Sequence, residues 1–327
     1  MSNSSRCGRF FSSITNLSFS LSTRTAPPFV SQKGHGALQG KEYKRSNTYM
    51  AILPSLTELL KAGVHFGHKE TKWHPKMAEY IFTVRNGIQI IDLEKTVEKL
   101  KQALEFLRTV VEGGGVALFV GTKPQARKHV QEAADRVNAP YVTERWLGGT
   151  LTNFAVIQKL VRKLEDIEQE LSAPEVEAKY TKLERLMFER ERARLTAVVG
   201  GIRTLKGLPQ VIILADVIHD ETAVREARRK LVPTIALCDT NTNPEVVTYP
   251  IPANDEASRS IELFMSLFGK TIEEGVAARA AKAIEAAAWS EKARAETVGP
   301  EEKEVVVPDE IMVEAVKKVG LKEELVV

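Results

Sequence analysis

The sequence lacks several features that would define whole classes of protein. Its 327 residues include two cysteines, Cys7 and Cys238, so a disulfide framework is excluded and a reducing compartment is favoured. No apolar run approaches the roughly 20 residues of a membrane-spanning helix. The net charge of +3 is far from the strongly basic balance of a protein wrapped in nucleic acid. Any nucleic-acid contact must therefore come from local basic clusters.

The charge that is present divides the chain into three parts. Residues 1–50 carry seven Lys or Arg and one acid, whereas residues 290–327 carry ten acids and six bases. The Ser- and Thr-rich start, 1–49, is typical of an organellar transit peptide and equally of an untranslated leader before a true start near Met50. We expect 1–49 to be a disordered leader or a misassigned start, 50–289 to be the folded domain, and 290–327 to be an acidic flexible tail.

Within the domain, apolar segments of strand length alternate with helical patterns. Strands are predicted at 116–120, 141–142, 210–216 and 234–239, with helices at 94–112, after Thr122, at 220–230 and over 254–288. This alternation predicts an α/β fold with a parallel sheet covered on both faces. Earlier in the chain, Ser55, Glu58 and Gly63 bound a short helix, and Asn86-Gly87 predicts a turn between two short strands.

One segment, 153–196, interrupts the alternation because it is helical almost throughout. Its apolar residues recur at alternating spacings of three and four: Ile157, Leu160, Leu164, Ile167 and Leu171. A break at 172–174 separates a second, highly charged helix. The pattern predicts an inserted helical hairpin with a narrow coiled-coil seam. We expect this arm to be separate from the core.

The stretch "AGVHFGHKETKWHPKM" (62–77) concentrates histidine, lysine and aromatic residues after the first helix, and we expect it to form a loop. His65 and His68 have a spacing that suits zinc, but no cysteine is near, and neither a nucleophile nor an orienting acid for a catalytic histidine is indicated. A loop packed on the sheet edge is the plain alternative. The interleaved lysines and aromatics favour contact with phosphates and bases instead.

Three further candidates lie beside predicted strands and in the connector before the hairpin. Thr122 and Lys123 can hold one phosphate at a helix start, although the glycines precede the strand, unlike those of a nucleotide-binding loop. Arg145 and Trp146 offer a cation and a stacking face. Trp146 and Leu147 can also anchor the hairpin to the core, and the two roles are compatible. Thr150 and Thr152 are expected to cap the hairpin.

Two aspartates at strand ends form the third candidate. Asp216 and Asp239 end two predicted strands, where ligands of parallel sheets bind, and with His219 they could hold a metal. The preferred alternative is that both aspartates cap the following turns.

Taken together, "LLKAGVHFGHKETKWHPKM", "FVGTK", "RWLGGTLTNF", "GIRTLKGLPQVIILAD", "PTIALCDTNTNP" and "IPANDEA" resemble the S2 family of bacterial-type small-subunit ribosomal proteins, in that family's order over roughly 53–270. The resemblance implies a flavodoxin-like parallel sheet flanked by helices, with a protruding helical hairpin and no catalytic activity. It implies a structural role in the small ribosomal subunit, with the small-subunit rRNA, neighbouring ribosomal proteins and the large mRNA-binding ribosomal protein as partners. A nucleotide-dependent enzyme on the same fold is the alternative.

The resemblance also implies a location for the protein and contacts of the candidate residues with the ribosome. We expect a cytoplasmic, ribosome-bound protein, or an organellar one if 1–49 is a transit peptide. No cofactor is expected, although the family's association with zinc keeps the metal hypothesis for Asp216, His219 and Asp239. The ribosome-contact candidates are His65, His68, Lys69, Lys72, Trp73, His74, Lys76, Arg85, Lys123, Arg145, Trp146 and Asn153.

Overall fold

The computed structural model describes residues 53–173 and 180–297, and all of the described elements belong to one structural unit, Ser46–Val327. The predicted leader at 1–49 and most of the predicted tail lie outside the described residues, so the domain boundaries stay predictions. No helix in the described part of the chain is long and apolar enough to cross a membrane.

A parallel sheet forms the centre of the fold, as predicted, but it contains five strands, one more than the four that the sequence predicted. Its strands are β4 (Ala117–Val120), β5 (Tyr141–Val142), β6 (Val211–Leu214), β7 (Thr234–Cys238) and β8 (Tyr249–Pro252), in the order β5-β4-β6-β7-β8. The central pair β4 and β6 runs in register from Ala117 opposite Val211 to Val120 opposite Leu214. All side chains of β4, β6 and β7 are buried, which explains their continuous apolar sequences.

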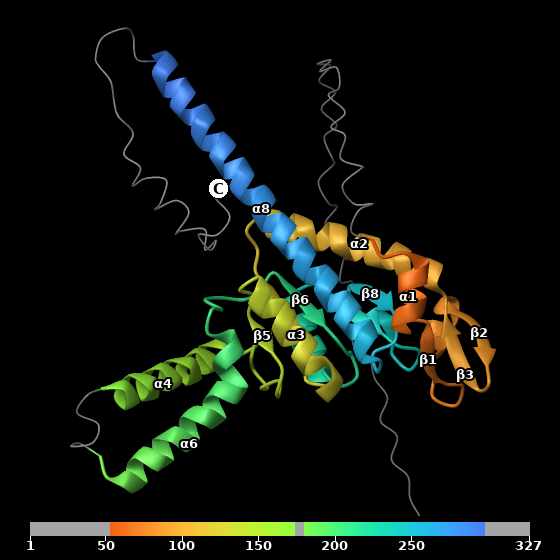
Figure 1. Ribbon diagram of the computed structural model, residues 1–327, viewed down its shortest axis with the longest axis horizontal. Helices are drawn as coiled ribbons and strands as arrows, with labels where there is room; N and C mark the ends of the chain where they lie inside the picture. Colours follow the sequence, from red (N-terminus) through yellow and green to blue (C-terminus); the bar gives the residue numbers. More distant parts are fainter. Residues whose placement is uncertain (1–52, 174–179, 298–327) are drawn as a thin grey trace, which may run out of the picture. The chain divides into compact units, whose positions relative to one another are not determined.

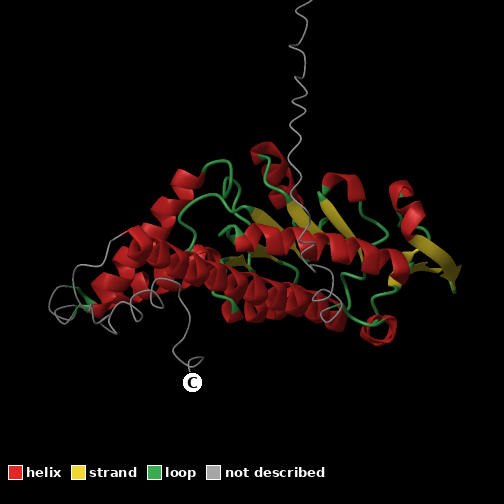
Figure 2. Cartoon of the chain, turned by 90° about the horizontal axis from the view of Figure 1, so that it is seen from above, coloured by secondary structure: helices red, strands yellow, loops and turns green. Residues whose placement is uncertain are grey.

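Helices cover both faces of this sheet (Figures 1 and 2). One face packs on α1 (Leu56–Ala62), α2 (Leu93–Glu112), α3 (Pro124–Arg136) and α8 (Ser258–Thr297). The other packs on α7 (Glu221–Lys230), the 3-10 turn η2 (Pro75–Tyr80) and the bases of two further helices. Successive β4 residues alternate between the two cores: Phe119 faces the first, and Leu118 and Val120 face the second. This arrangement confirms the flavodoxin-like α/β prediction.

A second, antiparallel sheet precedes the parallel one. It contains β1 (Phe66–Lys69), β2 (Ile81–Arg85) and β3 (Ile88–Ile91) in the order β1-β3-β2. The predicted turn at Asn86-Gly87 is confirmed, with both residues at positive φ. The prediction of a plain loop at 62–77 is wrong, because 66–69 pairs with β3.

The interrupting segment forms two long helices, α4 (Phe154–Ser172) and α6 (Lys182–Val199), which lie side by side and extend beyond the sheet in Figure 1. We call this pair the arm. Residues 174–179 between them lie outside the description, and the coiled-coil geometry stays a prediction. The expected separation from the core is wrong at the base. Ile157, Leu164 and Val199 are buried in the same cluster as Leu118 and Val120 of β4.

Short connections complete the fold. A 3-10 turn, η3 (Gly200–Ile202), leads from the arm toward β6, and another, η4 (Pro244–Val246), precedes β8. The capping box of Ser55 and Glu58 begins α1 as predicted, and Gly63 ends that helix at φ 75°. The closing helix α8 starts later and runs further than the predicted 254–288.

Candidate functional site

The three histidines of 62–77 do not form one cluster, because the pairing of β1 sends them to different environments. The ring of His65 lies against that of Phe66, with centroids 4.0 Å apart, and burial lowers the pKa of His65. His74 begins η2, where its Nδ1 accepts the backbone N–H of Lys76 at 3.2 Å. His68 points into a pocket of carboxylates. A local zinc site made of these histidines is therefore excluded.

The same segment presents cations and an indole to solvent. Lys69, Lys72 and Trp73 are exposed. Lys76 is also exposed, but its ammonium forms an ion pair with Glu245. Arg85 is exposed at the end of β2, next to the Asn86-Gly87 turn. Free positive charge on this surface thus comes from Lys69, Lys72 and Arg85.

Two hydrogen bonds to Thr240 fix the backbone of the segment. The Thr240 hydroxyl accepts the backbone N–H of His68 at 3.0 Å, and its carbonyl accepts that of His74 at 2.8 Å. Glycine is required at the preceding position, Gly67, because a Cβ there would lie 2.6 Å from the Thr240 methyl group. The segment that carries the exposed lysines is thereby hydrogen-bonded to the loop that follows β7.

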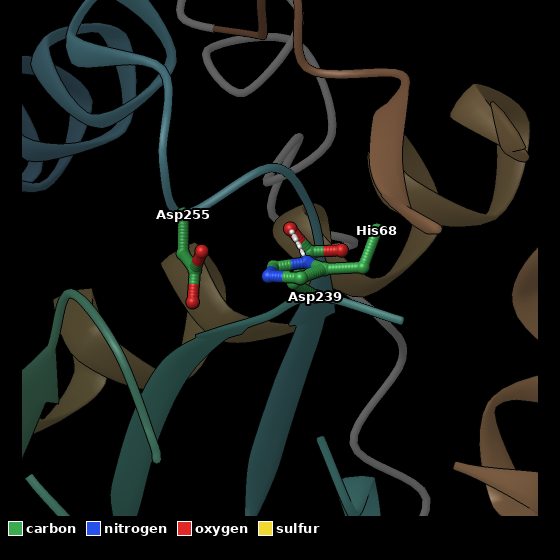
Figure 3. A group of neighbouring side chains, drawn as sticks. All are labelled: His68, Asp239 and Asp255. Carbon is green, nitrogen blue, oxygen red and sulfur yellow. Dashed lines mark ion pairs between the residues drawn. The ribbon is translucent and has the colours of Figure 1, made fainter. Parts of the chain in front are cut away.

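The pocket around His68 gathers carboxylates at the carboxyl edge of the parallel sheet (Figure 3). His68 Nδ1 lies 3.0 Å from Asp239 Oδ2, and its Nε2 lies 3.3 Å from Glu256 Oε1. Asp239 and Asp255 are 1% and 2% exposed, respectively. In Figure 3 the imidazole is directed toward both aspartates, which end β7 and follow β8. The hydrogen bond to Asp239 raises the pKa of His68.

Lys123 neutralises part of this charge. Its Nζ lies 3.0 Å from Asp255 Oδ1 and 3.2 Å from Asp216 Oδ2. Burial acts to lower the pKa of Lys123, but the two carboxylates outweigh it and the pKa is raised. Burial and the charges of Asp216 and Asp239 raise the pKa of Asp255 to about 7. These two ion pairs occupy the ammonium of Lys123, so they disfavour the predicted contact with an external phosphate, which stays a prediction.

The predicted metal ligands are brought together only in part. Asp216 Oδ1 accepts the backbone N–H groups of Ile218 and His219, as the capping alternative predicted. The His219 ring is instead hydrogen-bonded to the Thr122 hydroxyl, with Nδ1 and Oγ1 2.7 Å apart. That hydroxyl also donates to Asp220, so the prediction that Thr122 caps α3 is wrong. Asp239 does lie in a cluster, but with His68 and Asp255.

The sequence analysis missed Asp255, because the strand that precedes it, β8, was not predicted. Asp216, Asp239 and Asp255 each follow one of three neighbouring parallel strands, the third through "IPANDEA". One ligand atom each from His68, Asp239 and Asp255 lie within 4.8 Å of one another, and this is the one such group in the part of the chain that the structure describes. An imidazole nitrogen with two carboxylates suits zinc with an open fourth position. The buried negative charge around it would be relieved by a divalent cation.

The connector before the arm is fixed by a carboxylate on α7. Glu226 is 7% exposed and accepts the indole N–H of Trp146 at 3.2 Å. It also accepts the backbone N–H groups of Gly149, Leu151 and Thr152 at 2.7 to 3.1 Å. Burial acts to raise the pKa of Glu226, but these hydrogen bonds outweigh it and the pKa is lowered.

This arrangement gives each residue of the connector a defined environment. Trp146 is 8% exposed, so it anchors the arm to the core and leaves little of its ring surface for stacking on a base. Thr150 donates to the Leu147 carbonyl and Thr152 donates to Glu226, so neither caps α4. The N-cap is Asn153, whose side chain makes no cap hydrogen bond. Arg145 and Asn153 are exposed.

These features define the class of protein: a doubly wound α/β domain with a basic, aromatic surface at one end, a carboxylate pocket at the carboxyl edge and a helical arm. The comparisons then give the family. The family model described as "Ribosomal protein S2" matches residues 59–275. The chain belongs to the ribosomal protein S2 family. That family is structural, so the alternative of a nucleotide-dependent enzyme is wrong.

Individual relatives agree with the family model. The small ribosomal subunit protein uS2 of Fusobacterium nucleatum is 45% identical over 221 residues, which cover 68% of this chain and 90% of the relative. The uS2 protein of Desulfatibacillum aliphaticivorans is 49% identical over 221 residues, covering 68% of this chain and 75% of the relative. The uS2 protein of Bifidobacterium animalis subsp. lactis is 44% identical over 239 residues, which cover 73% of this chain and 78% of the relative.

Proposed function

We propose that the chain is a structural constituent of the small ribosomal subunit that binds small-subunit rRNA and neighbouring ribosomal proteins during translation. Family membership supports the ribosomal role. The observation that carries RNA binding is the surface of Lys69, Lys72 and Trp73, which is exposed while its backbone is fixed to Thr240. Cations beside an exposed aromatic ring suit phosphate contact and base stacking. Arg85, Arg145 and Asn153 are further exposed candidates on other elements.

The partners include neighbouring small-subunit proteins and the large mRNA-binding ribosomal protein, and the location follows from them. The protein is ribosome-bound in the cytoplasm, or in an organelle if residues 1–49 direct it there. A single chain with separate exposed surfaces, one at β1 and one along the arm, can contact RNA and protein at once.

Reconstitution of small subunits tests this function. Subunits assembled without an S2-family protein are mixed with the full chain and sedimented, and stoichiometric co-sedimentation is the expected result. Excess protein-free large-subunit rRNA serves as the competitor. Failure of the chain to sediment with small subunits, or equal retention by the competitor RNA, would overturn the proposal.

A second proposal concerns the carboxylate pocket, which the donor set of His68, Asp239 and Asp255 favours as a zinc site. Metal analysis of the purified chain after zinc loading and dialysis is expected to show one zinc. His68→Ala should remove it. His219→Ala should retain it, because His219 is bonded to Thr122 and lies outside the cluster. Equal zinc contents in the two variants would reject this ligand set.

A further inference from the structure

The last turn of α7 carries three adjacent cations that no carboxylate in the described part of the chain neutralises. Arg228, Arg229 and Lys230 are all exposed, and no ion pair joins them to a described acid. Arg225, one turn earlier, is tied to Glu221 with Arg225 Nη2 2.5 Å from Glu221 Oε1. The three unpaired charges are therefore open to an external anion.

The residue that follows these cations, Leu231, is an unusual residue type for a helix end and is highly exposed. It ends α7 in the left-handed region, with φ 56°, and its side chain is 88% exposed. Two other non-glycine residues with positive φ occur in the described ranges, Asn86 and Asn138. Asparagine tolerates this region and glycine is usual at the end of a helix, whereas a leucine there is strained. Backbone strain of this kind is retained mostly at functional positions.

This surface is separate from the sites described above. Helix α7 returns from the carboxyl end of β6 to the amino end of β7, so its last turn lies at the amino edge of the sheet. The pocket of His68, Asp239 and Asp255 lies at the carboxyl edge. Cations at a helix C-terminus also interact favourably with the helix dipole, but that interaction does not require an exposed leucine.

We propose that the last turn of α7 is an RNA-binding surface, in which Arg228, Arg229 and Lys230 contact backbone phosphates and Leu231 packs on a ribose or an unstacked base. The proposal rests on the proposed function, because the RNA is that of the small subunit. Arg225, Arg228 and Arg229 share one helix face, and guanidinium groups suit phosphate oxygens. A protein interface would bring a larger apolar centre than one leucine.

Binding to protein-free small-subunit rRNA across a salt series tests the surface. The variant combines Arg228→Gln, Arg229→Gln and Lys230→Gln. Its matched control combines Lys101→Gln, Arg259→Gln and Lys270→Gln, which removes the same charge from exposed positions of α2 and α8. We expect the α7 variant to lose about tenfold or more in affinity. Its slope of log affinity against log salt should fall by roughly 2 to 3, because each phosphate contact contributes about 0.7 to 0.9. The control should match the wild type.

Leu231→Gly provides the second variant. It should weaken binding several-fold with an unchanged salt slope, since no charge is lost, while its melting temperature does not fall. If the wild type binds neither subunits nor rRNA, the proposed function fails. If the wild type binds and the α7 variant equals its control, this surface is overturned alone. Weaker binding to subunits with unchanged binding to rRNA would place a protein at α7 and overturn the RNA assignment.

Discussion

Glu226 Oε1 lies 2.7 Å from the backbone nitrogen of Gly149, and this hydrogen bond joins α7 to the connector that leads into the arm. Gly149 has φ 98°, a conformation that a residue with a side chain rarely adopts, so the connector can approach the carboxylate closely only with glycine here. The same carboxylate accepts the indole N–H of Trp146. One side chain of α7 thus sets the direction in which the arm leaves the sheet.

Glu226→Gln should destabilise the fold by about 2–4 kcal/mol, because the new amide group faces donors that lose their acceptor. Glu221→Gln on the same helix is the control. Glu221 is exposed, and its loss should cost within about 0.5 kcal/mol. Urea unfolding of both variants measures the difference, and a cost below about 1 kcal/mol for Glu226→Gln would contradict the assigned role.

The contribution of Glu226 should depend on pH. Its pKa in the folded state is lowered from 4.5, so its carboxylate stabilises the fold above that pH, and the contribution is lost as the pH falls through the lowered value. The difference in unfolding free energy between wild type and Glu226→Gln should be full at pH 7 and shrink below about pH 4.5. A constant difference down to pH 3 would show that the hydrogen bonds do not depend on the charge.

Leu231→Asn should raise the stability of the free protein by about 0.5–1 kcal/mol, because asparagine tolerates the left-handed conformation and the exposed leucine loses no packing. Leu231→Ala retains a Cβ without the asparagine amide and should leave stability nearly unchanged. Thermal unfolding distinguishes the two. An equal gain from alanine would locate the effect in the apolar surface rather than in the backbone.

Two deletions of different length should distinguish the role of the base of the arm in stability from that of its distal part. Replacing 169–186 by a short Gly/Ser linker keeps the ion pair of Lys163 with Glu191 and that of Arg203 with Glu168, so cooperative unfolding should persist. Replacing 154–195 removes Ile157 and Leu164 from the second core and should abolish cooperative unfolding. Retention of a cooperative transition in the longer deletion would show that the arm is dispensable to the core after all.

Lys69→Ala with Lys72→Ala should weaken association with small subunits and reduce the salt slope by roughly 1.5 to 2. Lys76→Ala should have a smaller effect, because Glu245 already neutralises Lys76. The control is Lys101→Ala with Lys270→Ala, two exposed lysines on other helices. Co-sedimentation across a salt series provides the measurement, and equal losses in both double variants would reject the Lys69 surface.

The sequence predicted the elements whose pattern is local. The strand at 116–120, the Asn86-Gly87 turn and the paired helices of the arm all carry their signal within one segment. The failures involve contacts between distant segments. Thr122 resembles a helix cap, but Asp220, 98 positions later, takes its hydroxyl. Trp146 resembles a stacking residue in the sequence, but its indole N–H donates to Glu226, 80 positions later.

The candidate site divides in the same way. Lys69 and Lys72 are exposed, as the predicted contact of the interleaved lysines with phosphates requires. The commitment of Lys123 to Asp216 and Asp255 depends on the order of strands in the sheet, which the periodicity of single segments does not contain. Asp255 was missed for the same reason, because it follows β8, a strand that the sequence did not predict.

The attachment of β1 to Thr240 also sets the order in which the protein can mature during its own synthesis. His68 donates to Thr240, 172 positions later, and the Val64 carbonyl accepts the backbone N–H of Asn254. At about 5–20 residues per second, roughly 10 to 35 seconds separate the two partners of such a contact as they are added to the chain. The lysine-bearing surface is therefore among the last parts to acquire its final form, and a truncated nascent chain that ends before Thr240 cannot present it.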